Sequence, residues 1–175
     1  MQRTLLSILA LACLAAAPAS AQDKWVPFTS KQARFSVEMP TQPKATTTTT
    51  SSFIGTVTNE IFTSWEGDEK FTVDHSQIPS FALDFAGADT IYGHASAALL
   101  KQTWSKQTSF ADVTVNGQQG KQLVYDTPPV PGKPEIKGLA NLFLVGDRLY
   151  VIDAAVPAGE SEADAQRFLA SVRFE

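Results

Sequence analysis

Two neighbouring strands that are apolar on both faces constrain the fold of this chain most strongly. Leu142–Val145 and Leu149–Ile152 are apolar runs, with Gly146-Asp147 at the turn between them. A strand with one face in water alternates apolar and polar residues, whereas a strand buried on both faces does not. Glycine at the first turn position favours a type II′ hairpin turn. This pattern predicts a hairpin inside a sheet that carries a covering layer on each face.

Three earlier strands are predicted by alternation and by their boundaries. Arg34–Met39 alternates polar and apolar residues and ends at Pro40. A long strand over Phe53–Trp65 turns at Gly67-Asp68 and returns through Phe71–Ile78. The threonine-rich tract over residues 46–52 is either the exposed start of a strand or a flexible connector.

Two further strands meet at Asn116-Gly117, a strong hairpin signal because both residues favour the positive φ angles of a type I′ turn. The outgoing strand leads into the proline-rich segment over residues 127–134. Proline has no N–H to donate to a ladder. We therefore expect a stiff exposed loop here, with its prolines as candidate contact residues: Pro128, Pro129, Pro131 and Pro134.

Two helices complete the predicted elements. The first spans roughly Asp89–Lys106, with Asp89 as the N-cap and an apolar stripe that includes Trp104. The second follows Ser161 and Asp164, whose spacing resembles a capping box. Its expected buried residues are Ala165, Phe168, Leu169 and Val172. The order βββαββββα predicts an α+β fold: a largely antiparallel sheet of six or seven strands with helices on both faces.

The first 21 residues have the layout of a secretory signal peptide. Arg3 precedes a mostly apolar run over residues 5–17, and Ala19-Ser20-Ala21 forms a small-residue cleavage site. The run is shorter than the roughly 20 residues that a membrane-spanning helix needs. We therefore expect cleavage between Ala21 and Gln22, a single domain over residues 22–175 without a transmembrane anchor, and a periplasmic or secreted bacterial protein.

The only cysteine, Cys13, lies within this leader, so we expect a mature chain without thiols or disulfides. Cys13 is also a candidate for lipidation. However, the preceding Ala10-Leu11-Ala12 only loosely resembles a lipobox, and a complete cleavage site follows. Cleavage after Ala21 is therefore the favoured interpretation.

The charge pattern argues against two classes of partner. Removal of the leader takes away Arg3 and no acidic residue, so all 18 acidic residues remain against one fewer than the 14 basic residues of the full chain. The basic residues are scattered. Nucleic-acid binding and anionic membrane surfaces both require a basic patch, so we expect neither as a partner.

Short motifs at both ends of the mature chain resemble the PsbP-like (Mog1/PsbP) α/β/α sandwich group. They are Trp25-x-x-Phe28, the entry strand Arg34–Pro40, and Phe168–Phe174 after the apolar hairpin. The resemblance covers residues 24–175. It implies an accessory or binding role, often in an assembly at a membrane surface, and it carries no catalytic motif.

No catalytic constellation is evident. Asp74-His75-Ser76 contains the residue types of a hydrolase triad, but neighbours on a strand point to opposite faces. There is no Gly-x-Ser-x-Gly elbow. We expect His75 to be a partly buried histidine with a hydrogen-bonded partner, and we expect no enzyme activity.

The spacing of the remaining histidine and acids does not indicate a metal site. Asp84, Asp89 and His94 are close in sequence, but Asp89 and His94 do not share a helical face. Acidic residues near the Gly67-Asp68 turn are typical of a solvated turn, and those near the second helix suit its N-terminus. These acids are Glu66, Asp68 and Glu69 in the first group and Glu160, Glu162 and Asp164 in the second.

Three functions remain open, and the first is favoured. It is a non-enzymatic, monomeric module that binds a protein partner or assists an assembly of the cell envelope, without a cofactor. The second is a small-ligand carrier with a pocket between sheet and helix, lined by Phe71, Tyr92 and Trp104. The third is a hydrolase that uses His75 as its base. A sugar-stacking platform built from Trp25, Trp65 and Trp104 is a further hypothesis, with core packing as the favoured role of Trp104.

Overall fold

The computed structural model describes residues 25–52 and 55–175, and the expected leader with its Ala21–Gln22 cleavage site lies outside these residues. The described part contains ten strands and two helices. They are β1 (Val26–Ser30), β2 (Phe35–Met39), β3 (Lys44–Ser52), β4 (Gly55–Glu66), β5 (Glu69–Gln77), α1 (Ser80–Thr103), β6 (Lys106–Val115), β7 (Gln118–Thr127), β8 (Ile136–Val145), β9 (Arg148–Pro157), α2 (Ala163–Ser171) and β10 (Arg173–Phe174).

Seven of the strands form one antiparallel sheet in the order β3-β4-β5-β9-β8-β7-β6. The predicted turns have the expected backbone angles. Asn116 and Gly117 have φ angles of 52° and 84°, as a type I′ turn requires, and Gly146 has a φ of 61°. The hairpin of β8 and β9 lies near the middle of the sheet, which is why its residues are apolar on both faces.

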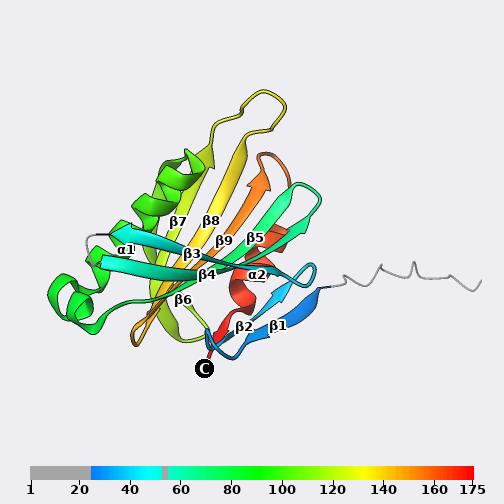
Figure 1. The fold of residues 1–175 in the computed structure, drawn as a ribbon. Helices are drawn as coiled ribbons and strands as arrows, with labels where there is room; N and C mark the ends of the chain where they lie inside the picture. The colour runs from blue at the N-terminus through cyan, green and yellow to red at the C-terminus, as the bar shows by residue number, and fades with distance from the viewer. Residues whose placement is uncertain (1–24, 53–54) are drawn as a thin grey trace, which may run out of the picture.

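Each face of the large sheet carries a covering layer (Figure 1). Helix α1 packs on one face, mainly against β7 and β8, and α2 packs on the other against β8 and β9. These layers confirm the predicted α+β fold with helices on both faces. The strand predicted over Arg34–Met39 lies outside the seven-stranded sheet, because β2 pairs with β1 and β10 in a separate three-stranded sheet.

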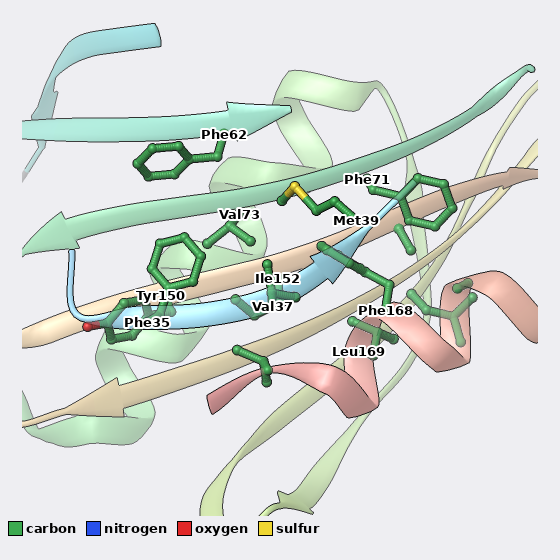
Figure 2. Packing of buried hydrophobic residues seen from close by; sticks show 14 of the residues in the cluster. Phe35, Val37, Met39, Phe62, Phe71, Val73, Tyr150, Ile152, Phe168 and Leu169 are labelled. Carbon is green, nitrogen blue, oxygen red and sulfur yellow. The ribbon is translucent and has the colours of Figure 1, made fainter. Parts of the chain in front are cut away.

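The three-stranded sheet helps α2 to cover a core of large aromatic and aliphatic side chains (Figure 2). Phe35 of β2, Phe71 of β5 and Phe168 of α2 are fully buried in it. Phe168 and Phe71 meet edge to face, with their ring centroids 5.4 Å apart. Tyr150 donates a hydrogen bond from its hydroxyl to the Ala33 carbonyl oxygen over 2.7 Å. Apolar burial at three different elements therefore fixes the small sheet against the large one.

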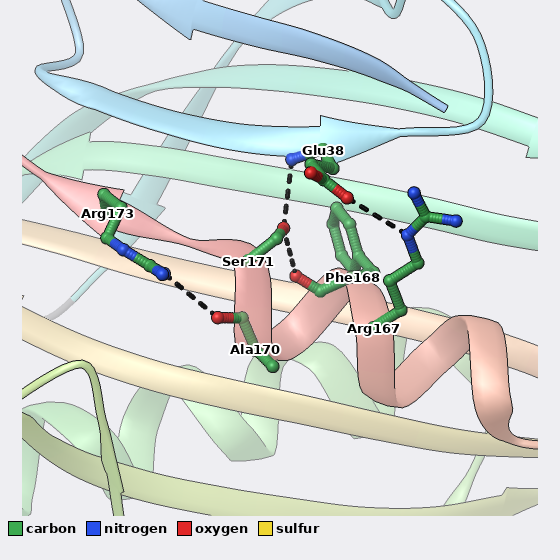
Figure 3. A network of polar contacts seen from close by, with 6 residues as sticks. All are labelled: Glu38, Arg167, Phe168, Ala170, Ser171 and Arg173. Carbon is green, nitrogen blue, oxygen red and sulfur yellow. Dashed lines mark hydrogen bonds and ion pairs between the residues drawn. The ribbon is translucent and has the colours of Figure 1, made fainter. Parts of the chain in front are cut away.

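Polar contacts also attach α2 to β2 (Figure 3). The Glu38 backbone N–H donates to Ser171 Oγ at 3.0 Å, and Arg167 Nε donates to the Glu38 carboxylate at 3.0 Å. Ser171 in turn donates to the Phe168 carbonyl oxygen. The closing helix is therefore bonded through both main chain and side chain to a strand from the other end of the domain.

The predicted boundaries of the helices need correction. α1 begins at Ser80, and Gly87 interrupts it with a non-helical φ of 72°, so Asp89 is not its N-cap. The N-cap of α2 is Glu162, without a side-chain capping bond, so the Ser161–Asp164 capping box was also wrong. Ser161 Oγ instead accepts a hydrogen bond from the Ala163 N–H. The expected buried face of α2 is confirmed.

Candidate functional site

The proline-rich loop between β7 and β8 is exposed and internally ordered. All of its described residues from Pro128 to Glu135 are exposed. The Lys133 N–H donates to the Val130 carbonyl oxygen over 2.8 Å, with Pro131 and Gly132 between them. Gly132 has a φ of 80°, so the tip is a type II turn with proline and glycine at their favoured positions. The tip of the loop is therefore held by a hydrogen bond within its own backbone.

Trp104 lies at the base of this loop in a backbone conformation that is costly for a bulky residue. It follows the last turn of α1 with φ 56° and ψ 35°, a left-handed conformation that glycine usually supplies at this position. Ser105, the next residue, places its Oγ 2.6 Å from Thr127 Oγ1 at the end of β7. The expected core role of Trp104 was wrong, because its side chain is 86% exposed.

Trp104 and Val130 therefore give this end of the molecule two exposed apolar side chains. Val130 is 55% exposed. In Figure 1 the loop projects beyond the sheet, and the end of α1 lies beside its base. Three exposed lysines are close to these residues in the chain: Lys101 on α1, Lys106 at the start of β6 and Lys133 in the loop. We call this surface, Trp104 together with Pro128–Pro134, the loop surface.

His75 is a buried histidine with an acidic neighbour, as expected. It is 8% exposed, and its Nδ1 lies 3.5 Å from a carboxylate oxygen of Glu60 on β4. Its ring packs on Tyr150 at 5.1 Å. Burial lowers the His75 pKa, and the Glu60 carboxylate partly opposes that shift. Asp74 and Ser76 lie on the opposite face of β5, so they form no triad with it.

Two acids on the other face of the sheet from His75 have perturbed pKa values: Asp153, which sequence reasoning missed, and Asp74. Asp153 on β9 is 5% exposed and accepts a 2.8 Å hydrogen bond from the Tyr125 hydroxyl. Burial raises the pKa of Asp153 to about 6, although the Tyr125 bond and the charge of Lys70 oppose this. Burial also raises the pKa of Asp74 to about 6.

The two groups of turn and helix acids meet in space. Glu66, Asp68 and Glu69 line a hollow of about 380 Å³ together with Glu160 and Asp164. Burial and the neighbouring carboxylates raise the Glu69 pKa. Glu162 lies apart from this group and binds Lys137 at 2.5 Å. Across residues 25–52 and 55–175, no three histidine or acidic side chains are grouped so that they could hold a metal ion.

The candidate ligand pocket and the tryptophan platform are not formed. Phe71 belongs to the core under α2, Tyr92 belongs to the core under α1, and Trp104 is exposed. Trp25 packs on Phe71, whereas Trp65 pairs with Lys70 on the opposite face of the sheet. The small-ligand pocket predicted from these side chains was therefore wrong.

No protein-family model matches the sequence, and no curated protein matches it either. The solution structure of cyanobacterial PsbP (CyanoP) from Synechocystis superposes on the chain with a TM-score of 0.59 at 15% identity, covering 93% of this chain and 99% of that one. The chain has a PsbP-like fold. This agrees with the resemblance in the sequence.

A crystal structure from Bacteroides thetaiotaomicron matches with a TM-score of 0.49 at 15% identity, and the match covers 85% of this chain and 48% of that one. In the described residues of this PsbP-like fold, no helix has the length and apolar character needed to cross a membrane.

Proposed function

We propose that the protein is an exported, non-enzymatic binding module of the cell envelope, and that the loop surface binds a protein partner. The observation that carries the proposal is the exposure of Trp104 and Val130 beside a loop whose tip is already held by a type II turn. A pre-formed loop loses little conformational entropy on binding. Tryptophan is among the residues that contribute most to protein interfaces.

The charges around the loop surface indicate what the partner offers in return. Lys101 and Lys106 are exposed on either side of Trp104 in the chain, and Lys133 is exposed in the loop. A partner surface with an apolar centre and acidic rim residues would complement this arrangement. The PsbP-like fold supports an accessory role, since its PsbP neighbour from Synechocystis shares the architecture.

Site-specific photocrosslinking tests the proposal. A photoreactive residue at Val130 should capture one defined partner from a periplasmic extract, and increasing salt should weaken the capture. An excess of unlabelled wild type should compete for this capture, whereas a variant with Pro128–Pro134 replaced by a Gly-Ser segment of equal length should not. Phe85 is 91% exposed on α1 and supplies a matched control. Capture through Phe85 with the same products, or competition by the Gly-Ser variant as strong as that by the wild type, would contradict the proposal.

A further inference from the structure

The outer edge of β3 has little of the protection that sheet edges normally carry. β3 is the last strand at one end of the seven-stranded sheet. It has nine residues, contains no proline, and Lys44 is its only charged residue. An open edge presents unpaired N–H and C=O groups that can pair with another strand. Natural proteins block such edges by charge, proline, a bulge or short length.

The other strand edges in the described part of the chain carry these features. β1 contains Pro27, and β10 has only two residues. β6, at the opposite end of the large sheet, has an irregularity in its pairing between Gln107 and Ser109. β6 also carries Lys106 and Asp112. The contrast marks β3 as the edge left open for pairing.

The exposure of β3 is the next feature that sets it apart from the inner strands of the sheet. Its described side chains, Lys44–Thr49 and Ser51, are exposed on both faces of the sheet. They belong to neither of the two hydrophobic cores. The strand is therefore held by its ladder with β4, and its free edge is the place where a second strand would add hydrogen bonds.

We infer that two copies of this chain pair β3 against β3, antiparallel, about a two-fold axis close to Thr48. This arrangement places threonine opposite threonine along the centre of the interface, and such cross-strand pairs are favourable. The two Lys44 side chains lie at opposite ends of the paired strands, so like charges do not meet. The same surface on both copies is used, as a closed two-fold dimer requires.

A second copy fits this edge better than a peptide from another protein. Strand addition by a peptide gains its specificity from pockets that receive alternate side chains. Neither the hollow beside Gln77–Ser80 nor the hollow lined by Glu66–Glu69 includes a β3 residue. An interface of one strand per copy is small compared with the roughly 1,200–2,000 Å² of stable complexes. The dimer is therefore weak and forms with increasing concentration.

Disulfide trapping tests the register. Cys13 is the only cysteine in the sequence, so a Cys13→Ser background makes an introduced cysteine unique in the exported protein. Thr48→Cys should oxidise to a covalent dimer at least tenfold faster than Thr46→Cys. In the inferred register the two Thr46 residues are about 14 Å apart, beyond disulfide reach. Thr114→Cys on β6 is the control for the other edge. Equal rates at all three positions would overturn the inference.

Sedimentation velocity, which measures the dimer dissociation constant, provides an independent test with the variant Thr48→Lys. In the inferred dimer this substitution places two ammonium groups opposite each other at the two-fold axis. We expect the dimer dissociation constant to rise at least tenfold, while Thr114→Lys leaves it unchanged. A wild-type protein that remains monomeric up to millimolar concentration would overturn the inference. If Thr48→Lys fails to fold by circular dichroism, the cysteine comparison decides. Neither the disulfide rates nor the dimer dissociation constant depends on the loop surface, so failure of this inference is distinguishable from failure of the proposed function.

Discussion

At the scale of single residues, two side chains hold states that are costly in isolation. Trp104 adopts a left-handed backbone conformation with its indole in solvent. Asp153 holds a carboxyl group in the core, with the Tyr125 hydroxyl as its hydrogen-bond donor. Such states persist when the surrounding structure fixes them, and a bulky residue with positive φ is an uncommon observation that invites a functional explanation.

Trp104→Gly separates stability from binding. Glycine adopts the left-handed conformation without steric cost, so we expect the free energy of unfolding to rise by about 1 kcal/mol. Urea unfolding followed by circular dichroism measures the change. Capture of a partner through the loop surface should fall in the same variant. If Trp104→Gly destabilises the fold, then the indole has a packing role that its exposure does not reveal.

Asp153→Asn should stabilise the protein near neutral pH. The Asp153 pKa is raised from 3.8 to about 6 by burial. Below the unfolded-state pKa both states are protonated, so the cost is absent. As pH rises from about 4 to 6, only the folded state keeps the proton, and stability falls by up to about 3 kcal/mol. Asparagine removes this dependence and can still accept the Tyr125 hydrogen bond.

Thermal unfolding from pH 4 to pH 8 measures the effect of Asp153→Asn. The wild type and the variant should converge near pH 4, move apart between about pH 4 and pH 6, and differ by a constant amount above pH 6. Asp84→Asn on the exposed surface of α1 is the matched control and should track the wild type. A constant difference between Asp153→Asn and the wild type at every pH would show that burial does not penalise the Asp153 charge.

At the scale of elements, local patterns predicted the central strands and their turns, while pairing between distant segments was not predictable. The β8–β9 hairpin follows from two apolar runs around Gly146-Asp147, and the β6–β7 hairpin follows from Asn116-Gly117. The small sheet was missed, because Arg173–Phe174 is too short to show alternation and pairs with Ser36 and Phe35 from the other end of the domain. No local sequence pattern predicts the pairing of β10 with β2.

The start of α1 and the exposure of Trp104 were missed for a related reason. Gly87 separates two helical segments, and the sequence pattern was strong only after it. Trp104 fits an apolar helical stripe, so its spacing predicted burial, but the helix ends at Thr103 and turns the indole outward. The loop surface was only half predicted: its prolines were identified, whereas the contribution of Trp104 depends on where α1 stops.

Gly138→Ala should disrupt the α1 face of the sheet. A Cβ at Gly138 of β8 would overlap the ring of Tyr125 from the adjacent strand β7. The ring would have to move, and its hydroxyl would lose Asp153. We expect a loss of about 2 kcal/mol or more in the free energy of unfolding. Chemical denaturation measures this loss.

Gly93→Ala provides the contrasting control for Gly138→Ala. A Cβ at Gly93 on α1 meets nothing within 4 Å, and alanine is the better helix former, so a gain of about 0.5–1 kcal/mol is expected. In the double variant Gly138→Ala/Tyr125→Leu, the two changes should be strongly non-additive. Additive losses would mean that the ring contact is not the cause.

At the scale of the whole molecule, the expected signal peptide predicts the mass of the exported protein. Cleavage between Ala21 and Gln22 should give an exported protein that begins at Gln22 and carries no lipid. Intact-mass spectrometry of the protein from a periplasmic fraction measures this directly. A lipid adduct on a chain that begins at Cys13 would replace the signal-peptide interpretation with a lipoprotein anchor.

The three-stranded sheet places the two ends of the described chain side by side. β1 and β10 flank β2, and the Glu175 N–H donates to the Arg34 carbonyl oxygen over 3.0 Å. During synthesis, β2 emerges long before α2 and β10, so its burial must wait for the final residues. The first strands therefore stay unburied while the rest of the chain appears. For a chain that is threaded through a translocation channel, this late closure would keep it open for transport and delay completion of the fold until release.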